Sequence, residues 1–400
     1  MRSSIHDPKC FFGADILRGV AILSVVLYHT FGRLYGFCLP WNGNWQDFHA
    51  PPSEHFLVFY PASFGWAGVA LFFVLSGFCI HTSCLRSPRF TNAQFFWHRF
   101  WRIYPAYLVA LVAFCCLERL DLTTSGGVKQ LLAHVLLVHN FHHASFFGIN
   151  PAFWSIAAEV QLYLLFPVVL LLRRRWGMGG CLAITFVASM LWRLMAVALC
   201  GLPERVGAPA FNSPIMTWFD WTLGAYIAER TAQQRRAFTK HAVWLAVLAP
   251  AFVFSTVFKP LTVFSFSLAA AVSAVVLDLM VSMRSSRNLG LSFLAFTGLI
   301  SYSVYLWHQP LLSMLSGWFG RFAPSLIAGV ATAGAIAGLS WLSYRLIERE
   351  GSRLGKRLWE RRAAPARASL PEGTLAPSRR AAQTSPAPVS PVPCSDSLPK

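Results

Sequence analysis

Charged side chains are scarce in this 400-residue chain, where Asp, Glu, Lys and Arg make up only 12% of the residues. A soluble globular protein carries roughly 25%. Hydrophobic residues account for 55%, and the mean hydropathy is +0.50. Long polar stretches between the apolar runs are also lacking, which leaves no room for a large soluble domain. The composition therefore excludes an ordinary water-soluble protein and indicates an integral membrane protein.

Acidic residues are rarer still, with 16 Asp and Glu against 34 Lys and Arg, for a formal net charge of +18. Such an excess can indicate nucleic-acid binding, but these basic residues lie between apolar runs and in the C-terminal tail. That distribution is typical of cytoplasmic loops facing anionic lipid headgroups. We expect the lipid bilayer as a partner and no nucleic acid.

Metal-binding and redox motifs are lacking as well. The nine cysteines include no CxxC pair and mostly fall within apolar runs, where small buried side chains explain them. His139, His142 and His143 have no carboxylate or thiolate close in sequence, so no metal is expected. The first apolar run lacks a small-residue cleavage site, which favours an uncleaved anchor over a signal peptide.

Apolar runs long enough to span a bilayer, about 20 residues each, are abundant. They predict an all-α integral membrane protein with about ten transmembrane helices. We expect a cytoplasmic N-terminus over 1–14, a membrane domain over 15–350, and a basic, then Pro/Ala/Ser-rich, disordered cytoplasmic tail over 351–400. The predicted spans are 15–33, 65–83, 102–118, 154–172, 178–200, 214–228, 241–257, 261–282, 292–316 and 325–346.

The basic residues between the spans predict the orientation. Ten spans with both termini in the cytoplasm place most loop Arg and Lys residues inside. The apolar stretch Gln130–Phe141 then has to remain on the outer side, because a crossing there would turn Arg173–Arg175 outward. We expect this stretch to form a re-entrant or interfacial helix.

Three ionisable residues lie in the first span: Asp15, Arg18 and His29. Charged groups inside a bilayer cost several kcal/mol and mark functional candidates. Arg18 and His29 are eleven residues apart, which places them on nearly the same helix face and roughly 16 Å apart. Asp15, three residues before Arg18, is positioned to form an ion pair with it. The alternative is that Arg18 reaches the headgroups and His29 only hydrogen-bonds within the bundle.

Arg99 and Arg102 lie on one face of the predicted start of the third span. A helix start attracts anions, so this pair is a candidate binding site for phosphate groups at the inner surface. The alternative is an ordinary positive-inside anchor. Three further intramembrane candidates are Glu159, expected near the depth of His29, Asp220 in the sixth span and His308 in the ninth.

Taken together, these segments resemble the family 3 acyltransferases, the polytopic membrane O-acyltransferases of bacterial surface polysaccharides and related acceptors. The resemblance covers about residues 11–348. Its motifs occur in the family's order, although Val160 stands where the family has a second Glu. They are Asp15–Ile22 followed by His29, Ser76-Gly77-Phe78, Arg99-x-x-Arg102 before Ile103-Tyr104-Pro105, Trp154–Pro167 with Glu159, Asp220 with Gly224, and Tyr302–His308.

The resemblance implies an acyltransferase of the bacterial inner membrane that uses acyl-CoA, most commonly acetyl-CoA, from the cytoplasm. It implies that Arg99 and Arg102 hold the CoA phosphates and that Arg18 draws the thioester inward. His29 would deprotonate the acceptor hydroxyl, or carry the acyl group transiently, and Glu159 would orient the imidazole or the acceptor.

A carbohydrate-type acceptor and a stand-alone form without a fused hydrolase-like domain are also implied. The alternative function is a transporter or flippase for a lipid-linked sugar, which would not consume a CoA thioester. The sequence indicates neither the identity of the acceptor molecule nor the oligomeric state.

Overall fold

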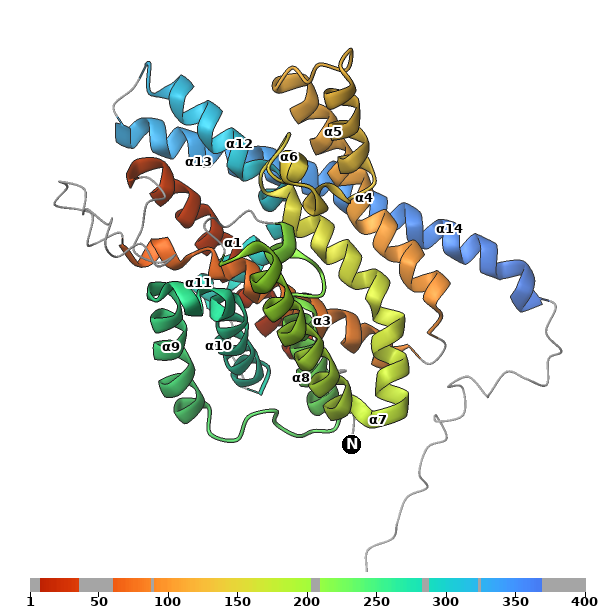
Figure 1. The fold of residues 1–400 in the computed structure, drawn as a ribbon. Helices are drawn as coiled ribbons and strands as arrows, with labels where there is room; N and C mark the ends of the chain where they lie inside the picture. Colours follow the sequence, from red (N-terminus) through yellow and green to blue (C-terminus); the bar gives the residue numbers. More distant parts are fainter. Residues whose placement is uncertain are drawn as a thin grey trace, which may run out of the picture. The chain divides into compact units, whose positions relative to one another are not determined.

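The computed structural model describes residues 8–35, 60–87, 90–202, 209–282, 288–322 and 325–368. They are helical almost throughout, as Figure 1 shows, and fall into two compact units, Met1–Gly355 and Lys356–Lys400. The helices are α1 (Pro8–Tyr35), η2 (Tyr60–Phe64), α3 (Ala67–Arg86), α4 (Asn92–Leu117), α5 (Ser125–Val135), η3 (His139–Phe141), α6 (His143–Phe146), α7 (Phe153–Cys200), η4 (Pro209–Asn212), α8 (Trp218–Ala232), α9 (His241–Val257), η5 (Lys259–Leu261), α10 (Thr262–Ser282), α11 (Leu289–Leu299), α12 (Ser301–Phe319), α13 (Ser325–Ser343), η6 (Tyr344–Glu348) and α14 (Arg349–Ala368).

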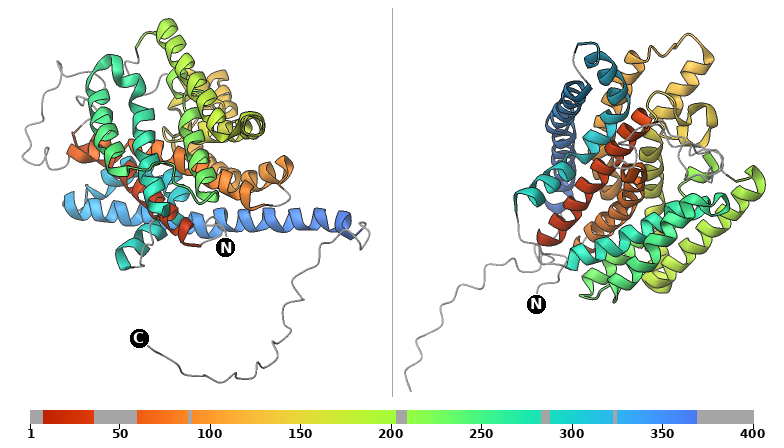
Figure 2. Two further views of the ribbon diagram at one scale, coloured as in Figure 1. Left: turned by 90° about the horizontal axis from the view of Figure 1, so that it is seen from below. Right: turned by 90° about the vertical axis from the view of Figure 1, so that its left-hand side faces the viewer.

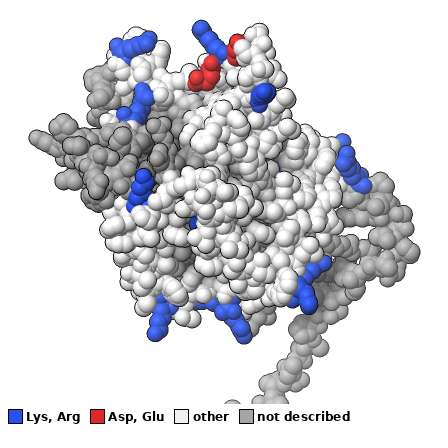
Figure 3. All heavy atoms as spheres, viewed as in Figure 1, with Lys and Arg blue, Asp and Glu red and all other residues white. Residues whose placement is uncertain are grey.

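The all-α membrane class is confirmed, but the count of ten spans is not. Six of the described helices are long and apolar enough to cross a bilayer, or seven if the bent pair α11 and α12 forms one span. Two predicted spans, α8 and α9, are shorter helices of 15 and 17 residues. On the face drawn in Figure 3, most charged side chains lie along the margins, which leaves a largely uncharged middle suited to lipid.

The predicted spans 154–172 and 178–200 lie in the single element α7, which breaks between them. Gly177 has φ +69° and ψ 175°, a conformation that favours glycine and interrupts the helix. The three arginines at 173–175 lie just before this break, so the predicted division is confirmed.

The predicted ninth span, 292–316, is not one straight helix. Helices α11 and α12 meet at Ile300 with a bend of 74°. A hydropathy average cannot detect a change of direction, which explains the difference. Ser301 to His308 therefore form the first turns of α12, directly after the bend. Figures 1 and 2 show α12 side by side with α13.

The apolar stretch Gln130–Phe141 forms no continuous spanning helix. Helix α5 ends at Val135 after 11 residues, and Leu137 has φ +56° before the short turn η3. Hydroxyl groups of α4 hold this segment, because Tyr104 donates to the Val135 carbonyl (3.0 Å) and Tyr107 to the His134 carbonyl (2.9 Å).

Two pairs of glycines let helices approach closely. A Cβ added at Gly77 of α3 would lie 1.9 Å from the Trp221 carbonyl oxygen of α8, and one at Gly224 would lie 1.9 Å from the Val74 carbonyl oxygen. Such contacts are sterically impossible, so only glycine fits either position. Gly19 of α1 and Gly298 of α11 meet in the same way. These two contacts bring α3 against α8 and α1 against α11.

Two predicted boundaries differ from the structure. Helix α4 begins at Asn92, ten residues before the predicted span, with the Thr91 hydroxyl accepting from the Gln94 N–H (3.2 Å). The tail predicted to be disordered from 351 is instead helical through Ala368, because α14 is rich in helix formers such as Arg, Leu, Glu and Ala. Residues 36–59 and 369–400 lie outside the described residues.

Candidate active site

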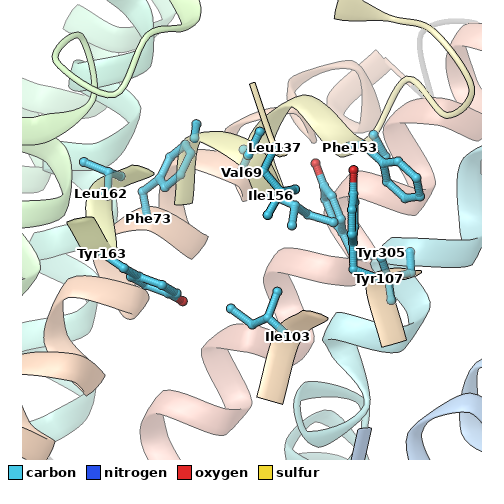
Figure 4. Packing of buried hydrophobic residues seen from close by; sticks show 14 of the residues in the cluster. Val69, Phe73, Ile103, Tyr107, Leu137, Phe153, Ile156, Leu162, Tyr163 and Tyr305 are labelled. Carbon is cyan, nitrogen blue, oxygen red and sulfur yellow. The ribbon is translucent and has the colours of Figure 1, made fainter. Parts of the chain in front are cut away.

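A cavity of about 110 Å³ lies where α1, α3, α4, α7 and α12 converge. Figure 4 shows Tyr163 of α7 and Ile103 of α4, both on its wall, facing one another across this region. The polar or charged side chains on the wall are Arg18, Ser76, Cys79, Arg99, Arg102, Ser155, Glu159, Tyr163, Ser301, Tyr302 and Tyr305. Four of the residues predicted from the sequence therefore share one cavity: Arg18, Arg99, Arg102 and Glu159.

Arg18 is held in place from two sides. Its Nη1 donates to the Asp15 carboxylate at 2.8 Å, so the predicted ion pair is confirmed. Its Nη2 lies 3.1 Å from the Cys79 sulfur of α3. A guanidinium fixed in this way has further N–H groups that can bind an anion or a carbonyl.

The two arginines of α4 differ in their surroundings. Arg99 lies 5.8 Å from the ring centroids of both Phe95 and Tyr163, close enough for cation–π attraction. Arg102 is half exposed, with Nη2 4.0 Å from the Glu348 carboxylate. Because α4 begins at Asn92, both arginines lie beyond its first turn, and the predicted contribution of the helix dipole is therefore wrong.

Glu159 carries the carboxylate of the cavity wall and accepts a hydrogen bond of 2.6 Å from the Tyr163 hydroxyl, one turn further along α7. One turn before Glu159, Ser155 forms a 2.6 Å hydrogen bond with the Tyr305 hydroxyl of α12. The contact between Ser155 and Tyr305 ties α7 to α12, and these residues line the cavity with hydroxyl groups.

His29 lies further along α1, beside α12. Its ring centroid is 5.1 Å from that of His308, with the planes inclined at 43°. The His308 ring is in turn 5.4 Å from the ring of Tyr305, which lines the cavity. The structure thus brings the predicted residues His29 and His308 together and links them to the cavity through Tyr305.

A family model described as an acyltransferase domain matches residues 11–345, which is most of the chain. The chain belongs to this acyltransferase family. It is therefore an enzyme that transfers acyl groups other than aminoacyl groups, with a multi-pass membrane domain, as the resemblance predicted. This assignment favours acyl transfer over the transporter alternative.

Several curated proteins are similar to this chain over most of its length. Nodulation protein 10 of Rhizobium leguminosarum bv. viciae is 25% identical over 377 residues, which cover 88% of this chain and 96% of the relative. The peptidoglycan O-acetyltransferase of Listeria monocytogenes is 23% identical over 381 residues, covering 87% of this chain but only 56% of the relative. An O-acetyltransferase of Staphylococcus aureus is also 23% identical, over 378 residues that cover 86% of this chain and 57% of the relative. No solved structure matches the chain significantly.

One predicted residue of the acyltransferase lies in a separate cluster. Asp220 of α8 is fully buried and accepts a hydrogen bond from Ser267 of α10. Ser267 also accepts from the buried Arg193, which in addition donates to the Val263 carbonyl at 3.0 Å. This cluster joins α7, α8 and α10, and Asp220 is not among the described residues that line the cavity.

Some residues of the acyltransferase site were not predicted. Glu348 is buried at the end of η6, a π-helical turn, where it accepts from Ser303 (3.0 Å) and faces Arg102. A carboxylate at the end of an apolar run was the available signal. Cys79 and Tyr163 gave no such signal, because neither a cysteine nor a tyrosine is unusual in an apolar helix.

Proposed function

We propose that this acyltransferase moves an acyl group, acetyl being the expected one, from acyl-CoA on the cytoplasmic side to a hydroxyl of a surface glycan or related acceptor. One observation carries the proposal. Arg18, Arg99, Arg102 and Glu159 are far apart in sequence, yet they line one cavity between five helices. Three guanidinium groups around one cavity of a membrane domain suit an anionic ligand.

In this proposal Arg99 and Arg102 hold the phosphates of the CoA donor. Guanidinium groups bind phosphate oxygens through paired, charge-assisted hydrogen bonds. Arg102 is half exposed and marks the entrance, while Arg99 is more enclosed, between the rings of Phe95 and Tyr163.

Arg18 faces the thioester carbonyl. Its ion pair with Asp15 leaves other N–H donors for the carbonyl oxygen of the entering thioester. Arg18 and His29 lie on nearly the same face of α1, roughly 16 Å apart along its axis. The thioester is therefore drawn along α1 from Arg18 towards His29, and the acyl carbon reaches the base still bound to CoA.

At the outer end, His29 acts as the general base. It removes the proton of the acceptor hydroxyl as the oxygen attacks the acyl carbon, the carbon–sulfur bond breaks, and the CoA thiolate leaves and recovers the proton. A transient acyl-His29 is the second possible route, in which the imidazole attacks first. Both routes need His29 and end in the same ester. Glu159, next to Tyr163, orients the reacting groups.

The chemical class of the acceptor is inferred from the name of one relative. The listerial relative is named for O-acetylation of peptidoglycan, a polymer of sugars with free hydroxyl groups. This chain spans only 56% of that protein, and the transfer to a glycan hydroxyl is proposed for the part that they share. We place both termini in the cytoplasm, as the distribution of basic residues predicts, and the enzyme in the inner membrane, as the resemblance to the family implies.

The test compares surface glycans by mass spectrometry from cells that produce the wild-type enzyme, His29→Ala or His143→Ala. His143 is an exposed histidine of α6 and provides the matched control. We expect the acyl mass to disappear only with His29→Ala, at equal amounts of protein in the membrane. Unchanged acylation with His29→Ala would refute the proposed role of His29.

A further inference from the structure

His308 has a defined tautomer. It lies on α12 with no exposed surface, and its Nδ1 is 2.9 Å from the Tyr305 carbonyl oxygen. A carbonyl oxygen can only accept a hydrogen bond, so Nδ1 carries the hydrogen. In the neutral imidazole, Nε2 is then a lone-pair acceptor.

That acceptor has no hydrogen-bond partner among the residues that the structure describes. His308 Nε2 is buried, and none of those residues donates to it. Leaving a buried polar atom unpaired costs about 1–3 kcal/mol, so a donor to this nitrogen would be stabilising.

The ring of His29 lies beside the ring of His308. The two rings approach to 5.1 Å between centroids, an arrangement that brings one imidazole within reach of the other directly or through one water molecule. Tyr305, whose carbonyl fixes the His308 tautomer, also lines the cavity proposed for the thioester.

We infer that His308 is a positioning residue for His29: its Nε2 accepts the N–H of the His29 imidazole and thereby leaves the other His29 nitrogen as the base. The inference rests on the proposed function of His29. It gives a neutral imidazole the part that a carboxylate plays in hydrolase triads, where the partner selects the tautomer and orientation of the histidine.

The proton balance follows from this arrangement. The unprotonated nitrogen of His29 takes the acceptor's proton while the N–H towards His308 is retained, which makes His29 an imidazolium during transfer. After the ester has formed and the carbon–sulfur bond has broken, that same proton goes to the CoA thiolate. His308 neither gains nor loses a proton.

The test compares His308→Gln with His308→Met in the purified full-length enzyme, using acetyl-CoA and a glycan acceptor. The two side chains are similar in volume, but only glutamine keeps an acceptor oxygen. We expect kcat to fall about 100-fold in His308→Met, in line with the loss of a positioned general base, with KM for acetyl-CoA within twofold of wild type. His308→Gln should recover at least tenfold of that loss.

Equal kcat in the two variants would overturn the inference, whether both are active or both inactive, because the acceptor atom would then make no difference. Thermal melting of both variants in detergent shows that each is folded. His29→Ala is measured alongside to separate the two claims. An inactive His29→Ala with a fully active His308→Met contradicts only this inference, whereas an active His29→Ala contradicts the proposed function itself.

Discussion

Replacing Arg99 by alanine should weaken the use of acetyl-CoA without impairing a donor that lacks phosphates. Arg99 lies on the cavity wall with its guanidinium against the rings of Phe95 and Tyr163. A hydrogen bond to a charged group contributes about 1.5–3 kcal/mol. Losing about 2 kcal/mol corresponds to a decrease of roughly 30-fold in kcat/KM, since 1.4 kcal/mol is a factor of ten.

The assay measures release of the free thiol from acetyl-CoA and from S-acetyl-N-acetylcysteamine, which carries the same thioester but no phosphate. For Arg99→Ala we expect the roughly 30-fold decrease with acetyl-CoA and less than a threefold change with the short donor. Arg99→Lys keeps the charge but loses the paired donors, so it should fall between wild type and Arg99→Ala. An equal decrease with both donors would refute the assignment of Arg99 to the phosphates.

Two further predictions concern the cavity wall and the helix contact behind it. Methyl methanethiosulfonate, a small thiol reagent, should inactivate the enzyme by modifying Cys79, which lies beside Arg18 on the cavity wall. CoA should protect the enzyme from this inactivation, and the Cys79→Ser variant should resist the reagent. Inactivation of Cys79→Ser at the wild-type rate would contradict the prediction. Gly77→Ala should lower the melting temperature in detergent, because its Cβ would lie 1.9 Å from the Trp221 carbonyl oxygen, and overpacking costs about 1–3 kcal/mol. Gly329→Ala, whose Cβ meets nothing within 4 Å, is the matched control, and an equal effect of the two substitutions would show that the close helix contact is not the cause.

Much of the fold could be predicted from apolar runs alone. Helix α9 has the predicted bounds, and α10 begins one residue after its predicted start, because each is a continuous apolar stretch between polar residues. The start of α4 was missed because Asn92–Trp101 mixes aromatic with basic residues and does not look like a span. The bend between α11 and α12 was missed because it changes the direction of the chain but not its hydropathy.

The candidate site was predictable only where a single residue stands out. Arg18, Arg99, Arg102 and Glu159 are ionisable groups in apolar surroundings, and each could be identified separately. That they share one cavity depends on how α1, α4 and α7 pack, which local patterns do not specify.

The residues that contact these side chains could not all be predicted from the sequence, for the same reason. Asp15 was predicted as a partner because it is three residues from Arg18 on the same helix, whereas Glu348 is on a distant element from Arg102. The contact between His29 and His308 likewise depends on the packing of α1 against α12.

The most direct test of acyl transfer from CoA is to measure free CoA released by the purified enzyme in detergent when a glycan acceptor is added to acetyl-CoA. We expect release that requires the acceptor, equals the ester formed on it, and is abolished in His29→Ala. Ester formation on the acceptor without release of CoA, or release that is unchanged in His29→Ala, would contradict it.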